Sequence, residues 1–372
     1  MPLATPFGGG EQMLRQLLRH GRGRGIEWIV TYLRDGPMAD ETRALGIETH
    51  VVNAGRFRDV MRRVGAIRRV ATLARACRAD LVVGWMVAGQ LIAGPAAWLA
   101  GVPCVWYQVG TPRPDWLDRV ATWLPARGVM VLSRHGAAAQ ARVRPVRRQW
   151  LVYPGASLDA FNPDALPTPA ELRRRFGLPA HGALIGMVAR LQRWKGVHVL
   201  VDALPAILAK RPDAHVIVVG GPHETEPGYA AELAARAGAL GVAHALRLVG
   251  FQSNVPEWMQ AMDVIVHASD REPFGIVVIE AMALGKPVVA GNEGGPAEII
   301  SDGVDGLLTP FGDAKALAAA VVRLSNERSF AERLGHAARA RAAQFDDRRY
   351  AEAVIAGLRE AASGGAPAAG RA

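Results

Sequence analysis

Residues 263–287 read DVIVHASDREPFGIVVIEAMALGKP and predict a strand, a turn and a helix in that order. The run Asp263 to Ala268 is short, apolar and rich in β-branched residues, which is typical of a buried strand. Ser269 to Gly275 has the polar, Gly and Pro composition of a turn. Local propensity favours a strand for Ile276 to Ile279. The Gly and Pro that close the segment are a helix stop, so we predict a buried helix there.

Two carboxylates of this segment are expected to face one cleft. Glu272 lies in the turn, and Glu280 follows after seven residues, one turn into the helix. A helix that begins near Gly275 offers unpaired N–H groups and a positive dipole end to a phosphate. Carboxylates accept hydrogen bonds from hydroxyl pairs, so sugar hydroxyls and a ribose diol are natural partners. The alternative is two unrelated surface glutamates beside a turn.

The length and composition of the chain favour two α/β domains. Half of the 372 residues are hydrophobic, which is enough for two full cores. Short apolar runs alternate with Ala-rich helical stretches, a pattern that predicts parallel sheets. Cys77 and Cys104 lack metal-ligand spacing, and no signal peptide pattern precedes them. We therefore expect a reduced cytoplasmic setting.

The predicted strands form two series, separated by a turn-rich stretch at residues 154–169. The first series is Ile26 to Tyr32, Leu81 to Val83, Cys104 to Tyr107, Gly128 to Leu132 and Gln149 to Tyr153. The second is Ala183 to Ala189, His215 to Gly220, Leu246 to Gly250, Asp263 to His267, Pro287 to Ala290 and Gly306 to Leu308. We predict Rossmann-like domains over residues 1–165 and 166–345. A C-terminal helix over 346–362 is expected to cross back to the first domain, and a disordered tail to occupy 363–372.

The first domain has an unusual beginning. A Rossmann-like domain needs a central strand ahead of its first glycine loop, yet only Met1 to Phe7 precede Gly8-Gly9-Gly10-Glu11. Either the natural start lies upstream of Met1, or the domain lacks its middle strand. We favour an upstream start, because losing a central strand would expose the edges of both neighbours.

The net charge of +10 lies entirely in the first half of the chain. Residues 1–165 carry 22 basic and 12 acidic side chains, whereas the remainder carries 22 of each. One predicted helix holds Arg58, Arg62, Arg63, Arg68, Arg69, Arg75 and Arg78 around the apolar Val60, Val64, Ile67, Ala71 and Ala74. Such a helix can rest on an anionic membrane or hold an anionic acceptor, or it can be an ordinary solvated face. No aromatic-basic interleaving supports nucleic acid as a partner.

Leu81 to Tyr107 contains no charged residue and is long enough to span a bilayer. Several Gly and Pro residues divide it into strand, helix and strand. That is the pattern of a parallel sheet buried on both faces, so we predict a buried sheet here instead of a transmembrane helix.

Across nearly the whole chain, several motifs together resemble the retaining glycosyltransferases of family 4. Glu272 and Glu280 stand where that family has its E-x7-E signature, and Gly294 to Glu298 stand where it has a GGxxE loop. Three further segments match: Ala189-Arg190-Leu191 through Lys195-Gly196, Val152 to Phe161 as the interdomain linker, and Gly8 to Glu11 as the first glycine loop. The linker departs from the pattern, with Pro154 in place of Asn. The resemblance implies the GT-B fold, two facing Rossmann-like domains with a ligand cleft between them.

The resemblance implies specific roles for these residues. Arg190 and Lys195 would clamp the diphosphate of a nucleotide-sugar and stabilise the leaving group without a metal or other cofactor. Glu272 would bind the transferred sugar and Glu280 the ribose. The remaining donor-binding groups would be the backbone of Phe274, Gly275 and Ile276, and Gly9 and Gly10 from the other domain. Glu298 is as well explained as a helix cap.

The activity that the resemblance implies is transfer of a hexose, with retention, to a hydroxyl of a glycan or lipid-linked acceptor. Such a reaction belongs to cell-envelope, polysaccharide or lipopolysaccharide biosynthesis, in the cytoplasm or peripherally on the inner face of the membrane. UDP- and GDP-sugars both remain candidate donors, because Phe251 to Val255, near the expected base site, does not discriminate between them. Epimerisation and phosphorolysis are rival chemistries on this fold. A rival of another class is a non-catalytic basic module that binds membranes or anionic glycans.

The histidines of this chain say less about its function than the motifs above do. Relatives often carry a His after the strand that corresponds to Val105 to Tyr107, where this chain has Gln108. The contact with the donor sugar is therefore expected to differ. His135 and His267 lie near strand ends without motif support, and we interpret both as structural.

Overall fold

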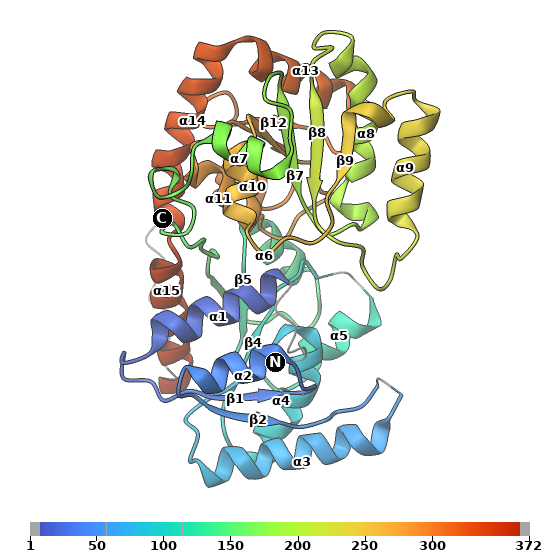
Figure 1. Cartoon of the computed structure of the whole chain (residues 1–372). Helices are drawn as coiled ribbons and strands as arrows, with labels where there is room; N and C mark the ends of the chain where they lie inside the picture. The colour runs from blue at the N-terminus through green and yellow to red at the C-terminus, as the bar shows by residue number, and fades with distance from the viewer. Residues whose placement is uncertain (1–7, 57, 113–114, 365–372) are drawn as a thin grey trace. The chain divides into compact units, whose positions relative to one another are not determined.

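The structure is a computed structural model that describes residues 8–56, 58–112 and 115–364 (Figure 1). It divides into two compact units. Unit 1 comprises residues 1–155 and 347–372, and unit 2 comprises residues 156–346. The division falls at Gly155 and Asp347, whereas the sequence pattern places it at residues 165 and 345. The difference arises because the Ala156 amide donates to the Phe345 carbonyl oxygen at 2.9 Å, which joins the linker to unit 2.

The strands of unit 1 form two separate parallel sheets in the described residues. One sheet pairs β1 (Ile29–Tyr32) with β2 (Glu48–Val51). The other has the order β3-β4-β5-β6, with β3 (Val82–Trp85), β4 (Cys104–Tyr107), β5 (Val129–Val131) and β6 (Gln149–Leu151). The sequence pattern predicts all of these except β2, whose residues ETHV are polar and largely half-buried.

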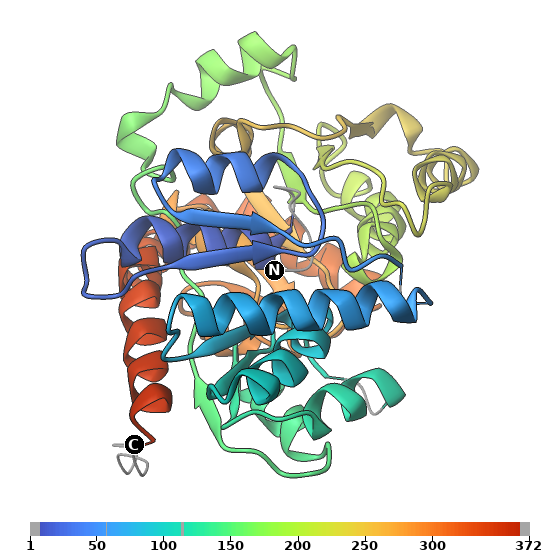
Figure 2. The ribbon, with the colours of Figure 1, turned by 90° about the horizontal axis from the view of Figure 1, so that it is seen from below.

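The helices of unit 1 pack around these sheets (Figure 2). They are α1 (Gly9–Gly21), α2 (Pro37–Ala44), α3 (Val60–Ala76), α4 (Met86–Ala100), α5 (Trp116–Trp123), α6 (Arg134–Ala141) and α15 (Asp347–Ser363). The last helix lies beside α1, and the Tyr350 hydroxyl on it meets the Tyr107 hydroxyl at 3.2 Å. Ser363, expected in the tail, ends this helix, and the tail from residue 365 lies outside the described residues.

The uncharged segment Leu81 to Tyr107 forms β3, α4 and β4, as the sequence pattern predicts. Its last strand is fully buried. A search of the helices in the described parts of the chain finds none of sufficient length and apolar character to cross a membrane.

Unit 2 contains one parallel sheet of six strands in the order β12-β11-β10-β7-β8-β9. The strands are β7 (Leu184–Val188), β8 (His215–Val219), β9 (Leu246–Leu248), β10 (Val264–His267), β11 (Val288–Gly291) and β12 (Leu307–Thr309). The α-helices are α7 (Pro169–Phe176), α8 (Val197–Leu208), α9 (Tyr229–Ala239), α10 (Val255–Ala261), α11 (Ile276–Ala283), α12 (Pro296–Ile299), α13 (Ala314–Asn326) and α14 (Arg328–Ala342). Short 3₁₀ turns lie at Pro163–Ala165, Arg193–Lys195, Ala243–Ala245 and Ala343–Phe345. All six strands and the helical state of Ile276 to Ile279 agree with the sequence pattern.

The strand order of unit 2 places a topological switch point between β7 and β10. The chain proceeds outward from β7 through β8 to β9 on one side, and from β10 through β11 to β12 on the other. Ligands of such sheets bind at the carboxyl ends of the strands, where the order reverses. The loops that follow β7 and β10 are therefore the place to look for a site.

Candidate functional site

The loops after β7 and β10 are held together through their backbones. The Asp270 amide donates to the Trp194 carbonyl oxygen at 2.7 Å. Gly196 has a φ of +75°, and a Cβ atom there would lie 1.9 Å from the Ala268 carbonyl oxygen. Only glycine fits this position, both for its left-handed conformation and for the close approach of the two loops. The close approach brings the side chains that follow the two strands into contact.

A buried ion pair joins these two loops. The Lys195 Nζ lies 2.6 Å from the Glu272 Oε2, and their side chains are 15% and 11% exposed. The same ammonium group lies 4.0 Å from the centre of the Trp194 ring, a cation–π contact. Charges at this depth are tolerated only when they are paired. The structure thus brings together two of the residues that the sequence motifs single out.

His267 is a third member of the cluster, which the sequence interpretation assigned to a structural role. It is the last residue of β10 and is 3% exposed. Its Nε2 lies 3.4 Å from the Glu272 Oε2 and 3.4 Å from the Ser269 Oγ. Its position five residues ahead of Glu272, at the carboxyl end of a central strand, is the sequence signal that could have found it.

The electrostatics of the cluster keep Glu272 ionised. Burial alone raises the pKa of this carboxyl, but the positive charge of Lys195 and the hydrogen bond and charge of His267 outweigh it. The pKa of Glu272 consequently lies well below its usual range. At neutral pH the side chain is therefore an anionic acceptor of hydrogen bonds and does not serve as a proton donor.

The glycine pair after β11 holds the backbone of Glu272. The Gly295 amide donates to the Glu272 carbonyl oxygen at 2.8 Å. Gly294 has a φ of +80°, and a Cβ atom there would lie 2.3 Å from that same oxygen. A Cβ atom on Gly295 would lie 2.2 Å from the Phe274 Cα. Both glycines of the GGxxE loop are thus required by close backbone packing against the turn that carries Glu272.

The remaining donor-binding candidates of unit 2 follow directly on this turn. Gly275, with a φ of +105°, precedes α11, which begins at Ile276. Phe274 is buried and packs edge-on against Phe345, with ring centres 5.9 Å apart. Glu280 lies on the same helix and is 5% exposed. The first turn of α11 therefore presents backbone amides beside the Glu272 turn, as an anion site requires.

Arg190 stands at the end of β7 and is exposed. In the described parts of the chain, its side chain has no hydrogen bond or ion pair. The backbone of Gly220 lies close to the residue before Arg190, since a Cβ atom on Gly220 would lie 1.9 Å from the Ala189 carbonyl oxygen. This cation is thus available for a ligand, in contrast to Lys195.

Gly9 and Gly10 belong to unit 1 and do not form the loop that the sequence motif predicts. They are the first two residues of α1, which Gly8 precedes in an extended conformation. The Trp85 Nε1 donates to the Gly10 carbonyl oxygen at 3.1 Å, and a Cβ atom on Gly10 would lie 3.0 Å from the Val109 Cγ1. The glycines are helical because this packing fixes the helix start against β3.

Gln108, which stands where relatives often carry a His, is buried in unit 1. Its Nε2 donates to the Asp118 Oδ1 at 3.1 Å. Among residues 8–56, 58–112 and 115–364, no group of three or more His, Cys, Asp or Glu side chains could hold a metal ion. The independence of the site from metals stays a prediction.

The comparisons with known proteins match part of this chain to a family model and to several relatives. Residues 170–341, which lie in unit 2, match the family model of the Glycosyl transferases group 1. The D-inositol 3-phosphate glycosyltransferase of Corynebacterium urealyticum is 36% identical over 186 residues, which are 48% of this chain and 43% of that protein. The lipopolysaccharide core biosynthesis mannosyltransferase LpsB of Rhizobium meliloti is 34% identical over 163 residues, 42% and 46% of the two chains. The chain spans about half the length of these curated relatives.

Solved structures match over nearly the whole length. Anabaena Alr3699/HepE, crystallised in complex with UDP and glucose, has a TM-score of 0.85 at 26% identity, with 96% of this chain and 98% of that chain covered. The lipopolysaccharide biosynthesis glycosyltransferase WaaG shares the fold, with a TM-score of 0.73 at 20% identity and coverage of 96% and 98%. The predicted GT-B fold is confirmed. Unit 2 carries a glycosyl transferases group 1 domain.

Proposed function

We propose that the protein is a metal-independent, retaining hexosyltransferase of family 4, which moves a sugar from a nucleotide-sugar to a hydroxyl of a glycan or glycolipid. The observation that carries this proposal is the buried Glu272, Lys195 and His267 cluster at the switch point of the group 1 domain. A purely structural role does not require an ionised carboxylate and an ammonium group at the carboxyl ends of two central strands.

The donor in this proposal is a UDP- or GDP-sugar. Anabaena Alr3699/HepE was crystallised with UDP-glucose and is 26% identical to this chain. Arg190 and Lys195 would bind the diphosphate, together with the N-terminus of α11. Glu272, ionised at neutral pH, would accept hydrogen bonds from the sugar hydroxyls, and Glu280 would accept those of the ribose.

The proposed reaction needs no enzyme nucleophile. The bond between the sugar C1 and the diphosphate oxygen breaks while a bond from C1 to the acceptor oxygen forms on the same face. The acceptor hydroxyl gives its proton to an oxygen of the leaving diphosphate. Negative charge builds up on that diphosphate, and the fixed cations Arg190 and Lys195 stabilise it. Glu272 stays ionised throughout and orients the sugar.

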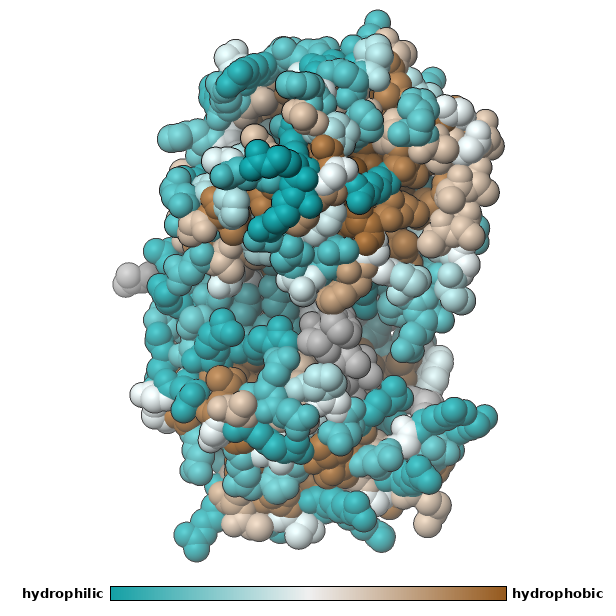
Figure 3. Space-filling model, in the orientation of Figure 1, coloured by the Kyte–Doolittle hydropathy of each residue, from teal (hydrophilic) through white to brown (hydrophobic). Residues whose placement is uncertain are grey.

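The proposed acceptor is lipid-linked or anionic. The reaction would belong to cell-envelope polysaccharide or lipopolysaccharide synthesis and would take place at the cytoplasmic face of the membrane. On α3, Val60 and Met61 are 65% and 83% exposed beside Arg62, so the helix presents apolar and cationic side chains together. The surface over α3 shows hydrophilic side chains with apolar ones between them (Figure 3). Three tryptophans of unit 1 are also exposed: Trp98, Trp116 and Trp123. Such a mixture is typical of proteins that bind an anionic bilayer surface.

The membrane part of the proposal has its own test. The Arg62→Glu/Arg69→Glu variant should lose binding to vesicles of phosphatidylglycerol and phosphatidylcholine, while its affinity for nucleotide stays unchanged. Arg174→Glu/Arg175→Glu on α7 is the control, since it makes the same charge change in unit 2. Equal vesicle binding by both variants and the parent protein would contradict the membrane proposal.

Nucleotide release from a panel of UDP-, GDP- and ADP-sugars tests the activity. We expect release from one donor, abolished in Lys195→Ala and Glu272→Ala. Lys210→Ala is the matched control, since it removes an exposed ammonium group from the same unit. If well-folded protein neither binds nor cleaves any donor, the function is that of a non-catalytic module that binds membranes or anionic glycans.

A further inference from the structure

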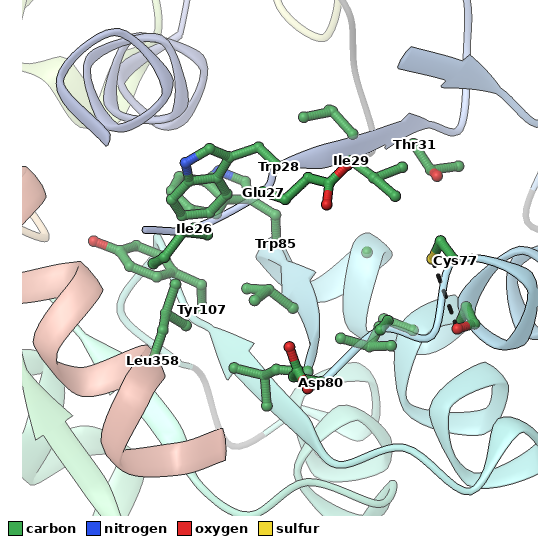
Figure 4. A pocket seen from close by; sticks show the side chains of 18 of the residues that line it. Ile26, Glu27, Trp28, Ile29, Thr31, Cys77, Asp80, Trp85, Tyr107 and Leu358 are labelled. Atoms are coloured by element: carbon green, nitrogen blue, oxygen red, sulfur yellow. Dashed lines mark hydrogen bonds between the residues drawn. The ribbon is translucent and has the colours of Figure 1, made fainter. Parts of the chain in front are cut away.

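Two cavities of unit 1 differ in the chemistry of their walls. The larger has a volume of about 460 Å³ and is lined mainly by apolar side chains, which include Trp28, Ile29 and Tyr107 (Figure 4). The smaller has a volume of about 350 Å³. Four of the eight residues that line it are arginines, and one is an acid: Arg34, Arg56, Arg58, Arg62 and Asp59. Walls of this composition attract an anion, and we call the smaller cavity the arginine pocket.

The arginine pocket lies at the carboxyl ends of β1 and β2, which run parallel to each other. The loops that follow the two strands stay together. The Val52 amide donates to the Tyr32 carbonyl oxygen at 2.8 Å, and the Ala54 amide donates to the Leu33 carbonyl oxygen at 3.3 Å. Arg34 belongs to the first of these loops. Since ligands of parallel α/β sheets bind outside the carboxyl ends of the strands, the pocket occupies a ligand-binding edge of unit 1.

The second loop is folded against the start of α3. Gly55 has a φ of +68°, and a Cβ atom there would lie 2.7 Å from the Asp59 Oδ2 and 3.0 Å from the Arg62 Cδ. The Asp59 Oδ2 accepts a hydrogen bond from the Arg56 amide at 2.8 Å. The Asn53 Oδ1 accepts one from the Gly55 amide at 2.9 Å. The protein's own contacts therefore fix the wall of the pocket, which lowers the cost of ordering it around a ligand.

The guanidinium groups of the pocket have no hydrogen bond or ion pair to any other part of the chain that the structure describes. Elsewhere in unit 1, Arg15 is paired with Glu41 at 2.8 Å and Arg43 with Asp40 at 2.6 Å. The one carboxylate of the pocket, Asp59, already accepts a hydrogen bond from the loop backbone. Four arginine charges and one aspartate charge leave a net charge of +3 around one cavity. Because like charges repel, a bound anion would stabilise this arrangement.

The charge and the volume of the arginine pocket define the class of its ligand. Guanidinium groups bind phosphate oxygens through two parallel hydrogen bonds. A phosphomonoester carries a charge of about −1.5 to −2 at pH 7, which matches the pocket better than the single charge of a phosphodiester or a sulfate ester does. A phosphate group alone fills only part of about 350 Å³. The remaining room admits a group of the size of a sugar, since small-molecule sites begin near about 300 Å³.

We propose that the arginine pocket binds the phosphomonoester of a phosphorylated sugar or polyol, present as a free molecule or as a lipid headgroup, and that this molecule is the acceptor. The binding depends on unit 1 alone, whereas the acceptor role rests on the proposed glycosyl transfer. Arg34 and Arg56 lie outside α3. Their substitution therefore leaves unchanged the helix that is proposed to meet the membrane.

Calorimetric titration with glucose 6-phosphate and with glucose 6-sulfate tests the binding. The parent protein should bind the phosphate ester more tightly, and Arg34→Gln/Arg56→Gln should weaken that binding on the order of tenfold or more, since hydrogen bonds to a charged group are lost. Arg19→Gln/Arg119→Gln, which removes two exposed charges elsewhere in unit 1, and Arg190→Gln in unit 2 should bind as the parent does. Equal affinities for the two esters would overturn the proposal. So would binding that is lost in Arg190→Gln and kept in Arg34→Gln/Arg56→Gln.

Vesicles of phosphatidic acid and phosphatidylcholine distinguish a lipid headgroup from a free molecule. If the ligand is a headgroup, Arg34→Gln/Arg56→Gln should bind these vesicles more weakly than Arg19→Gln/Arg119→Gln and the parent do. If the ligand is a free molecule, only the binding of glucose 6-phosphate should depend on the pocket. The proposal is wrong if neither probe distinguishes the pocket variant from its control.

The nucleotide-release assay tests the acceptor role. With the donor that the panel identifies, the phosphomonoester that binds should change the rate of release by the parent, because it either accepts the sugar or takes the place of the acceptor. Arg34→Gln/Arg56→Gln should not respond. An unchanged rate in the saturated parent would overturn the acceptor role and leave the binding site intact. If no donor is cleaved, the proposed glycosyl transfer fails, and the titrations still decide whether the pocket binds a phosphomonoester.

Discussion

Replacing Lys195 with Met would leave the Glu272 carboxylate buried without its main counter-charge. The two groups lie 2.6 Å apart with side chains 15% and 11% exposed. Breaking a buried pair by removing one partner costs about 3–5 kcal/mol. His267 stays within 3.4 Å of the carboxylate and compensates in part, so we expect about 3 kcal/mol, the lower end of that range.

The double variant Lys195→Met/Glu272→Gln separates the free energy lost with the ion pair from the cost of a buried carboxylate that has no counter-charge. It removes both charges, so its loss of stability should be smaller than that of Lys195→Met alone. Lys210→Met serves as the control for a surface lysine and should change stability by less than about 0.5 kcal/mol.

The assay is urea unfolding at pH 7 and at a series of lower pH values. Amide exchange in β10 is the probe, so that the unfolding of unit 2 is observed by itself. Because the folded pKa of Glu272 is depressed, its contribution is present above the unfolded pKa of about 4.3 and is lost as pH falls toward the folded value. The slope of stability against pH below about 4.3 should therefore shrink in Lys195→Met. A double variant as unstable as Lys195→Met, or less stable than it, would refute the reasoning.

Two further substitutions test other parts of unit 2. Gly196→Ala places a Cβ atom 1.9 Å from the Ala268 carbonyl oxygen and should lower Tm by several degrees more than Gly241→Ala does. Gly241 is the control, because its φ of +71° is similar but a Cβ atom there meets nothing within 4 Å. Equal losses of Tm would show that only the strain of the left-handed backbone matters. Burial lowers the pKa of Lys286 to about 8, although its Nζ donates to the Gln260 carbonyl oxygen at 2.7 Å. The unfolded chain binds more protons between about pH 8 and 10.4, so stability should rise with pH there, and calorimetry at several pH values should find no such rise in Lys286→Met.

Continuous apolar runs made the sheet of unit 2 predictable. Runs such as Val264 to Val266 are buried on both faces and leave no alternative to a central strand. The helix at Ile276 required a further argument, because its β-branched residues favour a strand and only the following Gly and Pro identify a helix. In contrast, β2 carries polar residues on a half-buried sheet and has no such signal.

The composition of the site was less predictable than its motifs. Glu272 and Lys195 are 77 positions apart in the chain. The family resemblance predicts that both bind one donor, but it does not predict the direct ion pair between them. His267 has no motif of its own, since its role comes from the turn that folds Glu272 back toward β10. Gly9 and Gly10 were expected in a loop, because the packing of Trp85 on the start of α1 is not visible in the local sequence.

Calorimetric titration of a nucleotide-sugar and of its free nucleotide tests the central claim most directly, namely that the Glu272 cluster holds the donor sugar. The parent protein should bind the nucleotide-sugar more tightly than the nucleotide. Glu272→Gln should bind both with equal affinity, while Glu293→Gln, an exposed control in a neighbouring loop, behaves as the parent. If Glu272→Gln keeps the full preference for the nucleotide-sugar, the cluster does not bind the sugar and the account is contradicted.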